Sequence, residues 1–88
     1  MKIKIKKNLI AETFDEGMVI LNITTGEYLE LDDTGEIFFN YLRELNDYEK
    51  VLAALVAHFD IDETELSKDL DHFILELKKN SLLEQEKK

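Results

Sequence analysis

The sequence predicts a single α+β domain, in which a small antiparallel sheet of three strands precedes three helices. Three observations lead to this fold class. The first third alternates apolar and polar residues at the period of two that strands show, and turn residues interrupt it. The remainder repeats its apolar residues at the three- and four-residue spacing of helices. With 88 residues and no proline, the chain is long enough for one core, and no proline interrupts a helix.

The strand region divides at two turn signals. Leu9 to Phe14 is the first predicted strand of the meander, and it ends at the turn-forming run Asp15-Glu16-Gly17. Met18 to Ile23 is rich in branched apolar residues, which favour strands. Thr24-Thr25-Gly26 then predicts a short hairpin loop in which Gly can take a positive φ, and Tyr28 to Leu31 returns antiparallel to the previous strand.

An additional strand is indicated at the N-terminus. Lys2 to Lys6 alternates Ile with Lys, which is the pattern of a strand with one buried face. This segment could join the three-stranded meander as an extra strand.

Each predicted helix begins at the same kind of signal. Asp33, Asn46 and Asp62 each stand three residues before a Glu, at the spacing where a short polar side chain caps a helix start and the Glu interacts favourably with the helix dipole. The helices are expected at about Thr34 to Leu45, Asp47 to Phe59 and Asp62 to Lys79. Their expected core-facing residues are Ile37, Phe38, Tyr41, Leu42 and Leu45, then Tyr48, Val51, Leu52, Leu55, Val56 and Phe59, then Leu66, Leu70, Phe73, Ile74 and Leu77.

Composition predicts a soluble, cytoplasmic protein. The chain has no Cys, which excludes disulfides and thiolate metal sites. Wholly apolar runs such as Met18 to Leu21 are far too short to cross a membrane, and the N-terminus lacks the apolar segment of a secretory signal. We expect one domain over residues 1–83, followed by a flexible polar tail over residues 84–88.

Charge is distributed unevenly along the chain, whose net charge is -9. Between Asn8 and Leu77 three basic residues stand against 18 acidic ones, while lysines gather near both ends. The predicted third helix carries six acids from Asp62 to Glu76 against only Lys68, and this charge opposes phosphate contacts and excludes nucleic acid as a partner. The acidic body favours cationic partners, although the same charges would also serve as an ordinary solvated surface.

No set of residues suited to catalysis can be assembled. His58 and His72 lie on different predicted helices, and neither has a second ligand at metal-binding spacing. Asp60-Ile61-Asp62 and Asp69-Leu70-Asp71 lack the central Gly and terminal Glu of a calcium loop. No nucleophile stands beside a base, and the three glycines occur singly, unlike a phosphate-binding loop. We therefore expect a protein that is not an enzyme and has no metal or cofactor site.

A strand-to-helix run carries a family resemblance. The run Gly26-x-Tyr28-x-x-Leu31-Asp32-x-Thr34-Gly35, with Leu77 and Leu82-Leu83 further on, resembles the pyrroloquinoline-quinone biosynthesis protein D family. The resemblance covers roughly Ile10 to Leu83, although the family more often has Asn where Asp32 stands. This family includes the RiPP recognition elements, small domains that bind the leader segment of a ribosomally made precursor peptide. The resemblance implies a winged-helix-like, non-catalytic domain that captures a leader by strand addition.

The resemblance also implies where the leader lies, which is along the third strand and in the cleft between that strand and the third helix. Helical spacing places Asp69 and Glu76 beside the Leu66-Phe73 stripe, with His72 further out on the same side, and these acids are candidates for selecting basic leader residues. Ordinary sheet packing is the alternative role for Leu29 and Leu31. The expected peptide-binding residues are Tyr28, Leu29, Glu30, Leu31, Asp32, Asp69, His72, Phe73 and Glu76.

Two further partner assignments remain open within the resemblance. The favoured one is a stand-alone leader-binding protein of a lasso-peptide pathway, whose next partner is the leader peptidase. The alternative is a peptide chaperone of pyrroloquinoline-quinone biosynthesis that acts with a radical SAM enzyme. A different class of function is a small regulatory module without a leader ligand. Phe39 and Leu75 lie off their helices' apolar stripes and are candidate residues for docking a partner enzyme, although single exposed apolar residues are common.

Overall fold

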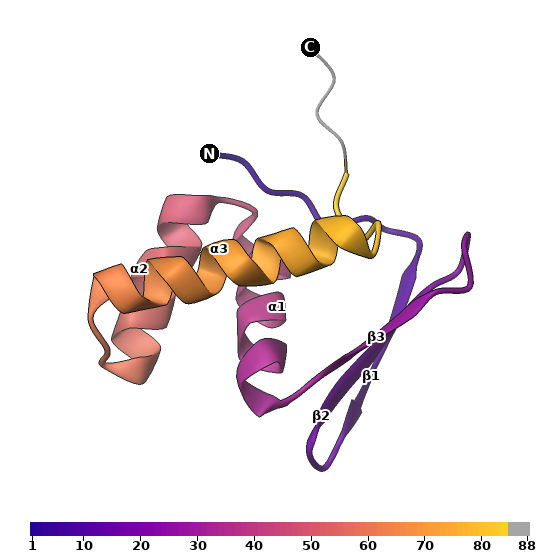
Figure 1. Cartoon of the computed structure of the whole chain (residues 1–88), viewed down its shortest axis with the longest axis horizontal. Helices are drawn as coiled ribbons and strands as arrows, with labels where there is room; N and C mark the ends of the chain where they lie inside the picture. Colours follow the sequence, from indigo (N-terminus) through magenta and orange to yellow (C-terminus); the bar gives the residue numbers. More distant parts are fainter. Residues whose placement is uncertain (85–88) are drawn as a thin grey trace.

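The computed structural model describes residues 1–84, and it confirms the predicted α+β, winged-helix-like architecture. Three strands precede three helices (Figure 1): β1 (Leu9–Phe14), β2 (Gly17–Asn22), β3 (Tyr28–Leu31), α1 (Asp33–Leu45), α2 (Tyr48–Phe59) and α3 (Glu63–Lys79). Of the predicted flexible tail, residues 85–88 lie outside the described residues, whereas Glu84 donates its backbone N–H to the Lys4 carbonyl oxygen at 2.8 Å. None of the helices within residues 1–84 is long and apolar enough to span a bilayer.

The sheet is an antiparallel meander in the order β1-β2-β3. A two-residue turn, Asp15 and Glu16, joins β1 to β2 and leads into Gly17. Gly17 has a φ of +146°, and a Cβ there would lie 1.9 Å from the carbonyl oxygen of Leu31 on β3. Only glycine allows this backbone conformation and this close approach. Gly17 therefore allows β3 to lie close against the start of β2.

The N-terminal segment does not join the sheet, which corrects the expectation of an extra strand. It makes isolated antiparallel bridges instead, from Lys2 to Asp47 and from Ile5 to Leu83. Its predicted alternation is nevertheless present, because Ile3 and Ile5 are buried. The segment crosses from the start of α2 to the residues that follow α3, so it covers part of the core and pairs with the chain at Leu83 (Figure 1).

Two of the three predicted helix caps are displaced by one residue. Asp32, not Asp33, caps α1 by accepting a hydrogen bond from the Gly35 N–H at 2.8 Å. Asn46 ends α1 in the left-handed conformation that Asn tolerates, and Asp47 caps α2. The reason is that an N-cap needs an extended backbone, which Asn46 lacks. The Asp62 cap of α3 is confirmed.

The core lies where α1 is enclosed by the sheet, α2 and α3 (Figure 1). Phe39 was expected to be exposed, but it is 0% exposed, so this prediction is wrong. A helix that packs against a sheet and two other helices buries more than one stripe, so Phe39 lies inside, with the Arg43 guanidinium 5.0 Å above its ring. The buried apolar residues are Ile3, Ile5, Met18, Ile20, Phe38, Phe39, Leu42, Val51, Leu52, Leu55, Leu66, Leu70, Leu77 and Leu82.

Asn22 is the one fully buried polar residue among residues 1–84. Its Oδ1 accepts hydrogen bonds from the N–H groups of Thr24 and Thr25, and its Nδ2 donates to the Ser81 carbonyl oxygen at 3.1 Å. A buried amide side chain is stable only when its groups are paired in this way. Asn22 therefore ties the β2–β3 loop to the end of α3, and it sets the position of β3 relative to that helix.

Candidate functional site

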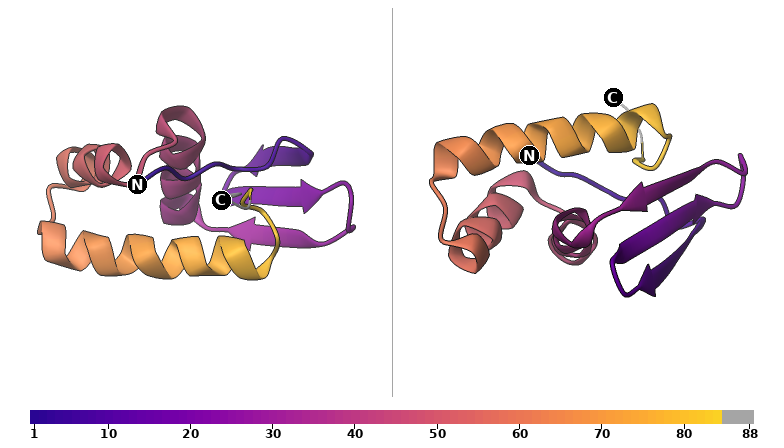
Figure 2. Two further views of the ribbon diagram at one scale, coloured as in Figure 1. Left: turned by 90° about the horizontal axis from the view of Figure 1, so that it is seen from above. Right: turned by 60° about the horizontal axis from the view of Figure 1, so that its bottom comes forward.

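The outer edge of β3 is open. In the sheet order β1-β2-β3, this strand pairs with β2 on one side only. In the view from above, β3 is the strand nearest α3 (Figure 2), yet no Cα atom of β3 lies within 8 Å of a Cα atom of α3. Adjacent strands lie about 4.8 Å apart, so an extended chain could pair with β3 before it reached the helix. Edges of this kind are templates for strand addition.

The hydrogen-bond register determines which backbone groups this edge offers. The Asn22 N–H donates to the Glu27 carbonyl oxygen at 2.8 Å, and hydrogen-bonded pairs alternate along an antiparallel ladder. Leu29 and Leu31 therefore bond inward to β2. The N–H and C=O groups of Tyr28 and Glu30 point outward instead, and these are the groups that an added strand would pair with.

The side chains of β3 alternate between two faces, as the sequence predicts. Leu29 and Leu31 are half-buried against the core, and Tyr28 and Glu30 are exposed, with Tyr28 at 64%. The predicted alternative of ordinary sheet packing for the two leucines therefore has direct support. Their remaining exposed surface is the part that could receive an apolar side chain from a neighbouring strand.

The predicted peptide-binding residues of α3 lie on the flank of the helix from which Phe73 contacts α1. The Phe73 ring packs edge-on against Phe38 with 5.6 Å between ring centroids, and it is only partly buried. Asp69, His72 and Glu76 are exposed on this side of the helix. The structure thus places an aromatic ring that continues the core next to a row of acids, as the helical spacing predicts.

Exposed acidic side chains are present on β3, at its junction with α1, and on α3. Glu30 and Asp32 lie at the β3 edge, and Asp69 and Glu76 lie on α3, and all four are exposed. Glu30 shares the outer sheet face with Tyr28, opposite the helices, so the acids of α3 that could favour basic peptide residues beside an added strand are Asp69 and Glu76. Asp32 also has a structural role, because its carboxylate caps the N-terminus of α1.

The motif that carries the family resemblance forms the junction from β3 to α1. Gly26 has a φ of +78° in the β2–β3 loop, a conformation that few other residues adopt. A Cβ on Gly35 would lie 3.2 Å from the Leu31 Cβ, so a small residue lets α1 begin close against β3. The motif therefore specifies the local geometry that presents the β3 edge.

The two candidate docking residues have different surroundings. Phe39 is buried in the core and unavailable to a partner, which removes it from the predicted docking surface. Leu75 is 50% exposed on α3, as expected from its position off the apolar stripe. It stays a candidate for docking a partner enzyme.

Sequence reasoning missed an apolar outer sheet face. Exposed large apolar side chains gather there, on the face opposite the helices: Ile10, Phe14, Leu21, Ile23 and Tyr28. The signal was present, since the strands carry apolar residues at both alternating positions. Two hollows with lysine-rich linings were missed as well, because each combines segments far apart in the sequence. Neither hollow lies between β3 and α3, so a cleft at that place stays a prediction.

The groups with shifted pKa values lie at the junction of the N-terminus and α2. The Asp71 carboxylate accepts a hydrogen bond from the Tyr48 hydroxyl at 2.6 Å and raises the pKa of Tyr48 to about 12. A hydrogen bond to Glu49 raises the pKa of the N-terminal amine, and the backbone N–H of Lys50 lowers that of Asp47. These interactions fasten the N-terminal segment and α3 to the start of α2. Within residues 1–84, no group of three His, Asp or Glu side chains is placed to hold a metal ion.

Comparison with known proteins gives one family and two solved structures. The family model described as coenzyme PQQ synthesis protein D matches residues 17–83. The structure of TbiB1 in complex with the TbiA(beta) leader peptide is 28% identical in sequence and has a TM-score of 0.84, with 97% of this chain and 99% of that chain covered. Lasso peptide synthetase B1 complexed with the leader peptide is 22% identical, with a TM-score of 0.81 and coverage of 97% and 100%, and it shows likeness of fold alone. No curated protein matches the sequence.

Proposed function

The chain belongs to the coenzyme PQQ synthesis protein D family, and from this premise we propose that it is a non-catalytic protein that captures the leader segment of a ribosomally synthesised precursor peptide. The leader adds to the outer edge of β3 as an extended strand and is presented to a maturation enzyme. The observation that carries this proposal is the open β3 edge, with the backbone groups of Tyr28 and Glu30 directed outward. The likeness to TbiB1, whose structure contains a leader peptide, supports a leader peptide as the ligand.

Backbone pairing and side-chain anchoring have separate roles in this mechanism. Each hydrogen bond at the β3 edge contributes about 0.5–1.5 kcal/mol net and is available to any sequence. Burying one large apolar leader side chain contributes about 1.5–3 kcal/mol. Discrimination among peptides therefore follows the anchors, which would enter between Leu31 and the partly buried Phe73. Asp69 and Glu76 add a preference for basic leader residues.

A titration tests the proposal. The probe is a fluorescein-labelled peptide with the leader sequence of a candidate precursor, and the readout is fluorescence anisotropy. We expect saturable binding with a Kd of about tens of micromolar or tighter, and no binding of a scrambled peptide with the same composition. A folded protein that shows no saturation in this range is not a leader-binding protein.

The genes beside this one would identify the partner enzyme. We infer a leader peptidase of a lasso-peptide pathway, and a transglutaminase-like peptidase and an asparagine-synthetase-like enzyme encoded nearby would support this. The family description favours a second candidate, a peptide chaperone that acts with a radical SAM enzyme in PQQ synthesis. Leu75→Ser tests enzyme docking, because it should weaken association with the enzyme while leader affinity is unchanged.

A regulatory module without a leader ligand is the remaining alternative. It would bind its partner protein through Leu75 with equal affinity in the presence and absence of leader. The outcome of the leader titration separates this module from the leader-binding protein.

A further inference from the structure

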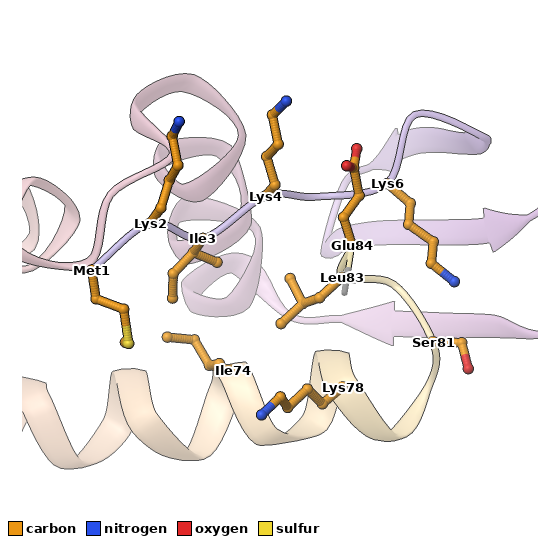
Figure 3. A pocket seen from close by; sticks show the side chains of 10 residues that line it. All are labelled: Met1, Lys2, Ile3, Lys4, Lys6, Ile74, Lys78, Ser81, Leu83 and Glu84. Carbon is orange, nitrogen blue, oxygen red and sulfur yellow. The ribbon is translucent and has the colours of Figure 1, made fainter. Parts of the chain in front are cut away.

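The fold collects lysines that are far apart in the sequence around one groove. The groove has a volume of about 760 Å³ and lies between the N-terminal segment and the C-terminal half of α3 (Figure 3). The antiparallel bridge from Ile5 to Leu83 and the hydrogen bond from the Lys6 N–H to the Leu82 carbonyl oxygen, at 2.9 Å, hold the two segments together. Lysines of the N-terminal segment and Lys78 of α3 therefore lie around one groove, although the intervening chain is strongly acidic.

The groove has an apolar middle and a basic border. The side chains of Ile3, Ile74 and Leu83 point toward one another in its middle, and Met1 lies beside them (Figure 3). The charged residues that line it are four lysines and one acid: Lys2, Lys4, Lys6, Lys78 and Glu84. Lys2 and Lys4 extend away from the apolar middle, so ammonium groups border the groove and do not fill it.

These ammonium groups are available to a partner. Within residues 1–84, the ion pairs join the N-terminal amine to Asp47 and Glu49, and none involves a lysine. On the other side of the N-terminal segment, a smaller hollow of about 350 Å³ is also lined by lysines and by Arg43. The positive surface is therefore broader than the groove itself.

We propose that this groove binds an acidic protein segment that carries an apolar anchor residue. Carboxylates would pair with the bordering lysines, while the anchor would contact Ile74 and Leu83. A polyanion such as nucleic acid fits less well, because its phosphates would also meet the field of the acidic body. A free phosphate would make no use of the apolar middle. The volume lies within the range of sites that enclose a small ligand or a few residues of chain.

The groove is separate from the β3 edge. Phe73 turns toward Phe38, whereas the next residue, Ile74, lines the groove, so the two surfaces lie on different flanks of α3. Asp69 and Glu76 lie on the Phe73 flank, whereas four lysines, three of them from the N-terminal segment, line the groove. A basic leader and an acidic segment of a second protein could consequently be bound at the same time. The proposal that this groove binds an acidic segment does not depend on the leader-binding proposal.

A peptide titration with matched charge variants tests the groove. The probe is a fluorescein-labelled peptide in which glutamates flank a central leucine, and a second peptide has serine in place of that leucine. In the full-length protein, Lys4→Glu with Lys78→Glu should weaken binding of the leucine peptide by about tenfold at low salt. Lys50→Glu with Lys68→Glu changes the net charge equally at exposed positions away from the groove, and should have a much smaller effect.

Several outcomes would overturn the proposal. Absence of binding would overturn it. Equal weakening of binding by the two double variants would also overturn it, because the effect would then depend only on net charge. Equal affinity for the leucine and serine peptides, or equal competition by inorganic phosphate or a short DNA duplex, would mean that the surface is an unspecific anion-binding region. Circular dichroism confirms that each variant is folded. Leader affinity should be unchanged in Lys4→Glu with Lys78→Glu, so failure of one proposal leaves the other standing.

Discussion

Replacing Glu30 by proline tests strand addition at a single backbone group. The hydrogen-bond register directs the Glu30 N–H away from β2, toward the open side of β3. Proline removes that N–H while leaving the β2–β3 ladder complete, and edge strands accept proline at such positions. Glu30 is also exposed, so no core contact is lost. The substitution should therefore impair partner binding far more than folding.

The expected loss of leader affinity follows from the missing bond. One backbone hydrogen bond contributes about 0.5–1.5 kcal/mol net, which corresponds to a Kd about two- to twelvefold weaker. The proline ring also occupies the edge where the incoming chain would lie. The measured loss should therefore reach or exceed the upper end of this range. Fluorescence anisotropy with the labelled leader gives the Kd, and urea denaturation gives the free energy of unfolding.

Two comparison variants isolate the cause. Glu30→Ala removes the same charge and keeps the N–H, so it should bind leader much more tightly than the proline variant. Leu29→Pro removes an N–H that bonds inward to β2, and it should lower the free energy of unfolding. Wild-type affinity in a folded Glu30→Pro protein would refute strand addition at this edge. An equal loss in Glu30→Ala would assign the effect to the carboxylate.

Three other changes should have measurable effects. Reversing Asp69 and Glu76 to Lys should weaken leader binding, more at low salt than at high salt, because both are exposed; unchanged affinity at low salt in the folded variant would show that this flank is only a solvated surface. Gly17→Ala should lower the free energy of unfolding by about 1–3 kcal/mol or more, measured by urea denaturation, because it combines a φ of +146° with a clash against the β3 backbone; wild-type stability would contradict this. The folded pKa of Tyr48, about 12, lies above its ordinary value of 10.0, so its hydrogen bond to Asp71 stabilises the fold fully below pH 10 and is lost as the pH rises through 12. Tyr48→Phe should show a smaller loss of stability over that interval, and identical pH profiles would count against the bond.

Local sequence patterns are sufficient to predict the strands, the helices and part of the binding edge. Alternation assigns the faces of β3, turn residues mark both hairpins, and helical spacing places Asp69 and Glu76 beside Phe73. These features depend on the geometry of a few neighbouring residues, which the sequence contains directly. Local patterns do not predict the outward direction of the Tyr28 and Glu30 backbone groups. It depends on the register with β2, which is a property of a pair of strands.

Other features required the tertiary structure. The burial of Phe39 follows from packing around α1 on more than one side, which the period of a single helix does not reveal. The contact of Asn22 with Ser81 and the bridge from Ile5 to Leu83 join residues that are distant in the sequence. The sequence by itself determined that both chain ends are basic and the body is acidic. Only the fold decided that the N-terminal lysines and Lys78 line one groove, because this arrangement depends on long-range packing and not on any local pattern.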